Sequence, residues 1–134
     1  MDKVIIDTSI WIEAFRPQGE KATADRVKGL VLDNRVLLPG LIKAELLRSA
    51  KSQAEFNQLK DLLSGLNYLP TPEPFWDDLS SFSFSLFRKG LAIPLVDTAI
   101  ALLCLENNAP LFHRDHHFDL ITKVTDLQTI DLTR

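Results

Sequence analysis

The sequence predicts an α/β/α sandwich with a central, mostly parallel sheet of about five short strands. Short apolar runs that suit buried strands alternate with longer segments whose apolar residues recur at helical spacing. The chain of 134 residues has the length of one domain, and its hydrophobic share of 46% and charged share of 25% are ordinary for a soluble globular protein. We therefore expect a single α/β domain over residues 1–134.

Strand and helix signals alternate through the first half of the chain. The apolar run at 4–6 indicates a buried strand, and Thr8 or Ser9 offers an N-cap for the helix that contains IWIEAF. Pro39 and Gly40 stop the second strand. The elements expected next are a helix at 19–33, a strand at 35–38, helices at 41–50 and 53–63, and a strand at 68–69.

The second half is expected to contain two long helices and two more strands. Apolar residues in 74–90 recur at helical spacing, although FSFSLF also alternates with the period of two that is typical of strands. Pro94 begins the longest apolar helix, which extends to about Glu106 and ends at Asn107 and Asn108. The last two strands are expected at 111–112 and 127–132.

Four acidic residues stand where predicted strands end or predicted helices begin. Asp7 and Asp115 follow strands, whereas Glu45 and Asp97 lie in the first turns of helices. In apolar surroundings a carboxylate is costly unless it is paired, hydrogen-bonded or bound to a cation. Because ligands bind at the carboxyl ends of parallel strands, we expect all four acids to meet in one cleft. Oxygen ligands suit a hard divalent cation, which indicates metal-assisted phosphoryl transfer.

Each acid also has a simpler explanation when it is taken alone. Asp7 and Asp97 suit a helix start, where capping and the helix dipole favour a negative charge. Glu45 suits a surface position, paired with a nearby lysine or arginine. Asp115 suits a turn in the polar segment HRDHH. Asp119 is a reserve metal ligand, or else the cap of a short helix at the LI pair that follows it.

The histidines and the single cysteine are weaker candidates for chemistry. His113, His116 and His117 are expected in one loop, and a zinc site needs further histidine or cysteine partners elsewhere. Cys104 lies among leucines in a predicted helix, which favours a buried hydrophobic role over a catalytic thiol. One cysteine also excludes an internal disulfide framework, which is compatible with a reducing cytoplasm.

Composition limits the classes of partner. The net charge of −3 argues against non-specific nucleic-acid binding by the whole surface, yet it is compatible with a nuclease that has basic residues beside its cleft. Lys43, Arg48 and Arg114 are candidates for phosphate contacts, with ordinary solvated charges as the alternative. No apolar run reaches the roughly 18 residues of a membrane span, and MDKVIIDTS does not have the pattern of a signal peptide. We expect a cytoplasmic protein with no membrane partner.

Three segments of the chain carry a family resemblance. They are VIIDTSIWIE near the N-terminus, AELL around Glu45, and PLVDTAIALLCLENNAPLFHRDHHFDLI towards the end. Through them the chain resembles the PIN-domain ribonucleases, and within these the VapC-type toxins of toxin–antitoxin pairs. The motif D-T-S is very short, but the ordered set D-T-S, A-E-L, D-T-A-I-A and R-D-x-x-F is distinctive and extends over essentially the whole chain.

The resemblance implies a function and a site. It implies a Mg²⁺- or Mn²⁺-dependent endoribonuclease that cleaves structured or looped RNA. The four acids would be the metal ligands and catalytic residues, and Thr8 or Ser9 would help to hold them. It further implies a cognate antitoxin whose C-terminal segment lies across the groove of the toxin, and commonly a homodimer.

The chain departs from the family pattern in its last motif. The family usually has T-x-D-x-D-F, whereas this chain has His113 and His117 in place of the threonine and the second aspartate. Asp115 is kept, so the site holds one or two ions, with Asp119 as the candidate replacement. The departure leaves a second function class open, namely a catalytically weak PIN-like module that binds or regulates through an antitoxin-type partner.

Two phosphate-handling alternatives fit the sequence less well. A haloacid-dehalogenase-type phosphatase with Asp7 as its nucleophile needs a second aspartate two residues later, where this chain has Ser9. A phosphoacceptor receiver domain needs an early acidic pair beside the first strand, which Asp2 and Asp7 do not form.

Four aromatic residues are candidates for an exposed apolar partner surface, and we expect at least two of them to lie in the core instead. They are Trp11, Phe15, Phe75 and Trp76.

Overall fold

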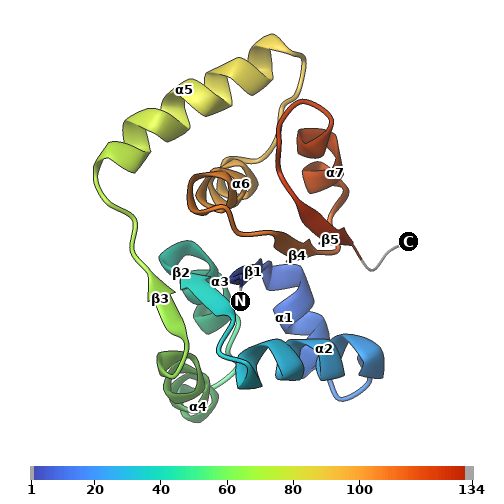
Figure 1. Ribbon diagram of the computed structural model, residues 1–134. Helices are drawn as coiled ribbons and strands as arrows, with labels where there is room; N and C mark the ends of the chain where they lie inside the picture. Colours follow the sequence, from blue (N-terminus) through green and yellow to red (C-terminus); the bar gives the residue numbers. More distant parts are fainter. Residues whose placement is uncertain (1, 132–134) are drawn as a thin grey trace.

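The computed structural model describes residues 2–131, and its centre is one five-stranded sheet (Figure 1). The strand order is β3-β2-β1-β4-β5, and every neighbouring pair is parallel. The chain therefore adds strands on one side of β1 and then crosses to the other side at β4. This reversal between β1 and β4 is the point at which open parallel sheets commonly bind ligands, outside the carboxyl ends of the strands.

The strands are short and lie close to the predicted positions. Both β1 and β4 are buried at every residue, as expected for central strands of a parallel sheet that is covered on both faces. The last strand is shorter than predicted, and the expected end at 132 lies outside the described residues. The strands are β1 (Val4–Ile6), β2 (Val36–Pro39), β3 (Asn67–Leu69), β4 (Leu111–His113) and β5 (Thr129–Asp131).

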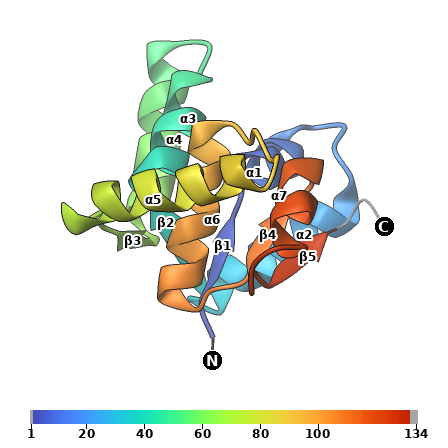
Figure 2. The same cartoon turned by 90° about the horizontal axis from the view of Figure 1, so that it is seen from above.

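Helices cover both faces of the sheet, which confirms the predicted α/β/α architecture. In Figure 1, α5, α6 and α7 lie on one side of the sheet, and α1, α2 and α4 lie on the other. Seen from above, α5 crosses α6 on the outside of its layer (Figure 2). Within residues 2–131 the helices are α1 (Thr8–Phe15), α2 (Lys21–Leu32), α3 (Gly40–Arg48), α4 (Gln53–Ser64), α5 (Pro74–Arg88), α6 (Leu95–Asn107) and α7 (His116–Thr122).

Helix α6 forms the middle of the core on its side of the sheet. Every residue from Thr98 to Cys104 is buried, as expected for a helix that is apolar all round and has protein on several sides. It ends at Asn108, which adopts the left-handed conformation with φ 51° and closes the helix as predicted. Within residues 2–131, no helix is long and apolar enough to span a membrane.

The segment with two competing periods is the helix α5. Its buried residues, Phe75, Leu79 and Leu86, lie on one face at helical spacing. Two of the four aromatic candidates for an exposed surface are core residues, because Trp11 and Phe75 are almost fully buried. Phe15 and Trp76, by contrast, are exposed. The expectation that at least two of the four belong to the core is therefore confirmed.

Two helix starts differ from the sequence-based expectation. Asp7, rather than Thr8 or Ser9, is the N-cap of α1, and its side chain accepts the backbone N–H of Ser9. Asp115 is the N-cap of α7, so Asp119 lies within the first turn instead of capping a shorter helix. Both differences have one physical cause, since a carboxylate directly after a strand can satisfy the free N–H groups of the helix that begins there.

Candidate active site

Asp7 lies at the carboxyl end of the central strand and is only 5% exposed. Its Oδ2 accepts two hydrogen bonds from Ser9, one from the backbone N–H at 3.2 Å and one from the hydroxyl at 2.6 Å. Burial raises the pKa of the Asp7 carboxyl; the Ser9 bonds lower it, and the nearby charges of Asp97 and Glu45 raise it further. Asp7 is thus held rigidly, with Oδ1 outside both of these bonds.

Glu45 reaches the same place from α3. Its Oε1 accepts the hydroxyl hydrogen of Thr8 at 2.7 Å, a contact between residues far apart in sequence. Within residues 2–131, neither Lys43 nor Arg48 forms an ion pair with Glu45. The half-buried Glu45 is therefore fixed by the first turn of α1 rather than by a neighbouring cation.

Asp97 occupies the first turn of α6 and faces the last motif of the chain. Its Oδ2 lies 3.1 Å from Nδ1 of His117. Burial raises the pKa of the Asp97 carboxyl, and the charge of Asp115 raises it further. The hydrogen bond and charge of His117 act in the opposite direction, and Glu45 adds a smaller increase. Asp97 thus experiences the charges of two other members of the predicted set.

Asp115 completes the group from the N-cap of α7. Its Oδ1 accepts the backbone N–H of His117 at 2.9 Å and lies 3.2 Å from Nδ1 of the same residue. Its own backbone N–H donates to Nδ1 of His113 at 3.1 Å. His113 is the last residue of β4 and is fully buried, so the three histidines do not share one loop as expected. The buried imidazole instead holds the turn in which Asp115 stands.

The predicted acids therefore meet at the carboxyl edge of the sheet, beside the reversal between β1 and β4. The charge of Asp97 acts on Asp7, that of Asp115 acts on Asp97, and that of Glu45 acts on both Asp7 and Asp97. Such mutual repulsion raises the free energy of the folded state unless a cation compensates it. Carboxylate oxygens, which all four acids supply, are the donors that a hard divalent ion such as Mg²⁺ or Mn²⁺ prefers.

The sequence did not predict that His117 contacts the acidic residues of this site. His117 stands two residues after Asp115, where the resembling family usually has its second aspartate, and that position was the available signal. With His116 and Asp115 it forms a group whose donor atoms all lie within 4.8 Å of one another. The reserve ligand Asp119 has Oδ1 3.9 Å from Nε2 of His113, which is too long for a hydrogen bond.

The three basic candidates for phosphate contact have different surroundings. Arg114 contacts Glu13 at 3.1 Å, Glu20 at 3.1 Å and Thr23 at 3.4 Å, and so ties the β4–α7 connection to α1 and α2. The Lys43 ammonium lies 5.9 Å from the centre of the Tyr68 ring. Arg48 is exposed in the last turn of α3.

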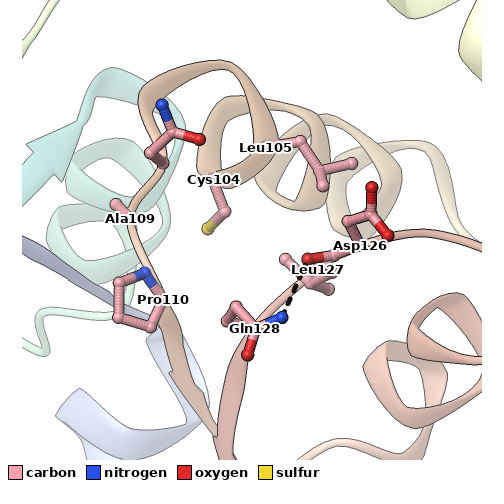
Figure 3. Close-up of a pocket in the computed structure, with 8 residues that line it drawn as sticks. Cys104, Leu105, Ala109, Pro110, Asp126, Leu127 and Gln128 are labelled. Atoms are coloured by element: carbon pink, nitrogen blue, oxygen red, sulfur yellow. Dashed lines mark hydrogen bonds between the residues drawn. The ribbon is translucent and has the colours of Figure 1, made fainter.

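A cavity of about 310 Å³ lies at the opposite end of α6 (Figure 3). It is lined by residues that precede β4 and β5, among them Pro110 and Gln128, and so lies at the amino edge of the sheet. Burial raises the pKa of the Cys104 thiol beside it, which disfavours a reactive thiolate. The prediction that Cys104 is a buried hydrophobic residue is confirmed.

Comparison with known proteins agrees with this geometry. Residues 4–124 match the PIN domain family. The chain belongs to the PIN-domain family. It is 30% identical over 129 residues to the VapC ribonuclease Mb1587 of Mycobacterium bovis and to ribonuclease VapC11 of Mycobacterium tuberculosis, covering 93% of this chain and 96% of each relative. The resemblance to VapC-type PIN-domain proteins is confirmed.

Solved structures from other bacteria share this fold. This PIN-domain chain superposes on FitAcB from Neisseria gonorrhoeae with a TM-score of 0.77 at 20% identity, covering 96% of both chains. It superposes on VapBC-1 from nontypeable Haemophilus influenzae with a TM-score of 0.73 at 26% identity, covering 98% of both chains. The fold is therefore shared along nearly the whole chain.

Proposed function

We propose that this PIN-domain protein is a metal-dependent endoribonuclease and the toxin of a toxin–antitoxin pair. The observation that carries the proposal is the mutual electrostatic influence of carboxylates from four separate parts of the chain at the carboxyl edge of the sheet. Burial and mutual repulsion raise the pKa of Asp7 and Asp97. Binding of a cation is therefore favourable, because it offsets the repulsion between the carboxylates. Relatives named VapC ribonucleases, 30% identical over nearly the full length, support ribonuclease activity.

The four acids would hold Mg²⁺ or Mn²⁺, and the protein's other groups would keep them in place. A bound ion supplies polarisation of the phosphodiester and activation of a water molecule. Ser9 orients Asp7 and Thr8 orients Glu45 through their hydroxyl groups. One carboxylate of the set takes the proton of the attacking water, which requires hydrogen-bond distance from that water.

We infer that the substrate is RNA with an accessible backbone, in a single-stranded or looped region. A carboxylate site at the end of a sheet can only reach a phosphodiester that is not shielded by a regular duplex. Lys43 and Arg48, both on α3 with Glu45, are the proposed contacts for flanking phosphates. Arg114 keeps this role as a weaker proposal, because its guanidinium already contacts two glutamates.

An apolar groove whose lining includes none of the four acids supports an antitoxin-type partner. The groove measures about 530 Å³ and is formed by the end of α1 together with α3 and α4. Ile12, Phe15 and Leu62, which line it, are all more than 40% exposed. Exposing several neighbouring apolar side chains to water is unfavourable, and such a surface suits the apolar face of an amphipathic segment. We propose that the cognate antitoxin places such a segment here.

We also infer a cytoplasmic protein that forms a homodimer or a larger assembly with its antitoxin. Helix α5 leaves Trp76, Phe84 and Phe87 exposed, and these are the proposed area of subunit contact. The exposed aromatic candidates Phe15 and Trp76 thus fall on two different surfaces, one at the groove and one on α5.

A catalytically weak binding module is the second candidate function. It is favoured by His117, whose ring contacts both Asp97 and Asp115 where the family usually has another acid. With one acid fewer, such a protein would keep its fold and its antitoxin surface while cleaving RNA slowly.

Expression in a bacterial host separates these two functions. The wild type, Asp7→Ala and a matched surface control, Asp25→Ala on α2, would be induced in turn, and cellular RNA would be mapped for new ends. Growth arrest with new RNA ends in the wild type and the control, but not in Asp7→Ala, is the expected result. New RNA ends in none of the three strains would overturn the ribonuclease proposal and favour the binding module.

A further inference from the structure

The imidazole of His117 lies between two carboxylates of the candidate site. Its Nδ1 is 3.1 Å from Oδ2 of Asp97 and 3.2 Å from Oδ1 of Asp115. Its backbone N–H is bonded to Asp115 at 2.9 Å, and its ring lies against that of His116 with 4.3 Å between centroids. One nitrogen is therefore held in a fixed position against oxygen atoms from two different helices.

These separations match those of donor atoms that share one ion. Two donors on adjacent corners of an octahedron, each about 2.1 Å from the ion, are about 3.0 Å apart. Both measured separations are close to that value. Nδ1 therefore needs little movement to exchange a hydrogen bond with the carboxylates for a bond to an ion between them.

We propose that His117 is itself a ligand of the divalent ion, through Nδ1, and that it gives the site a preference for Mn²⁺ over Mg²⁺. This inference rests on the proposed function, because it concerns the same ion. An imidazole nitrogen suits transition metals, whereas Mg²⁺ favours oxygen donors and retains its water. The replacement of an aspartate by His117 thus changes which ion is selected, while Asp97 and Asp115 remain in place.

The other two histidines are less suited to this role. Nδ1 of His113 already accepts the backbone N–H of Asp115, and its ring is fully buried against Phe118. The His116 side chain is 77% exposed, and its Nδ1 lies 3.6 Å from Oδ1 of Asp115, farther than that of His117. His116 is therefore the natural control, since it has the same chemistry on the same helix without the contact to Asp97.

The test measures metal binding directly on the whole chain, without RNA. Titration calorimetry would give the affinities for Mn²⁺ and for Mg²⁺, and pulsed electron paramagnetic resonance of the Mn²⁺ complex would detect a directly bonded ¹⁴N nucleus. The variants are His117→Asp, which restores the usual family residue, and the control His116→Gln. His117→Asn serves as a second variant should the added charge of aspartate prevent folding, which circular dichroism would reveal.

The expected result is a directly bonded nitrogen signal in the wild type and in His116→Gln, and its loss in His117→Asp or His117→Asn. The ratio of Mn²⁺ to Mg²⁺ affinity should fall on the order of tenfold or more in His117→Asp, the scale on which residues around a metal ion alter its affinity. Mn²⁺ binding with no nitrogen signal, or with an unchanged affinity ratio in His117→Asp, overturns this inference and leaves the proposed nuclease intact. Absence of binding of either ion overturns both.

Discussion

The hydroxyl of Thr8 donates a hydrogen bond of 2.7 Å to Oε1 of Glu45 and thereby joins the first turn of α1 to α3 at the candidate active site. Asp7 directly precedes Thr8, and its carboxylate is held by the hydroxyl of Ser9, which directly follows Thr8. Three consecutive residues at the end of β1 thus place two of the four acids. The junction between β1 and the first turn of α1 therefore positions half of the acidic set.

The first prediction concerns Thr8→Val, which keeps the shape of the side chain and removes its hydroxyl. Glu45 would lose its fixed orientation, so metal affinity should fall on the order of tenfold, the lower end of the range for residues that orient ligands. The free energy of unfolding should fall by about 1 kcal/mol. Calorimetry with Mn²⁺ checks the affinity, with Ser64→Ala at the end of α4 as a control that removes a remote hydroxyl. Equal affinity in Thr8→Val and the wild type would mean that Glu45 does not contact the ion.

The second prediction concerns Asp97→Asn and thermal stability. Mn²⁺ or Mg²⁺ should raise the melting temperature of the wild type, because the ion binds only the folded site and relieves its repulsion. Asp97→Asn should show a much smaller rise, and its apo form should melt no lower than the wild type since one repelling charge is gone. Thermal scans with and without metal provide the measurement. A rise of the same size in both proteins would remove Asp97 from the set of ligands.

The third prediction concerns pH and the metal-free protein. The pKa of Asp7 and of Asp97 is raised in the folded state, so the folded protein holds protons more tightly than the unfolded chain does. The free energy of unfolding should therefore fall as pH rises from about 4 through the raised pKa values, and the full penalty should persist above them. Urea titrations across this pH range in EDTA would measure the slope. Asp7→Asn keeps an N-cap residue and should flatten the slope; an unchanged slope would assign the titration to other groups.

The fourth prediction separates two roles of Arg114. Its contacts to Glu13 and Glu20 predict a structural role, so Arg114→Met should lower the free energy of unfolding by about 1 kcal/mol. A phosphate contact predicts instead weaker RNA binding at unchanged stability, as expected for Arg48→Met on α3. Urea unfolding and RNA-binding titrations on both variants distinguish the roles. Loss of RNA affinity in Arg114→Met without a loss of stability would restore the phosphate assignment.

The fifth prediction concerns the groove between α1, α3 and α4. Leu62→Asp should abolish binding of the cognate antitoxin while leaving the fold intact, because Leu62 is more than half exposed. The control is Leu32→Asp on α2, which is also exposed and does not line the groove. Copurification of the antitoxin with each variant provides the measurement. Equal copurification with both variants would place the partner on another surface.

The order of helices and strands could be predicted from the sequence, because most segments show either the helical spacing of apolar residues or a short apolar run typical of a strand, but not both. The apolar runs at 4–6 and 111–112 are short and uninterrupted, which is typical of central parallel strands. The helix α5 was ambiguous because its exposed face carries Phe84 and Phe87, and apolar residues on both faces blur a helical period. Which residues are buried depends on distant parts of the chain, and it is the burial of one helical face that identifies α5 as a helix.

The positions of the acids followed from the topology, whereas their partners did not. The carboxyl ends of parallel strands lie at one edge of the sheet, so Asp7 and Asp115 could be placed at that edge from the order of elements alone. The pairing of β1 with β4, which makes them neighbours, comes from the structure. The polar segment HRDHH predicted a loop, but His113 is the buried last residue of β4. Its Nδ1 accepts the backbone N–H of Asp115, which satisfies that ring nitrogen inside the core. The contact of His117 with Asp97 depends on how α7 lies against α6, which local sequence does not encode.

The complete burial of the middle of α6 has a consequence for hydrogen exchange. Backbone amides from Ile100 to Cys104 have no route to solvent that leaves the sheet and the neighbouring helices packed, so they exchange only when the whole domain unfolds. Asp97 stands one to two turns earlier in the same helix. The exchange rates of these few amides therefore report the global stability of the domain. Slower exchange of these core amides after addition of an ion would show that the ion binds the folded protein.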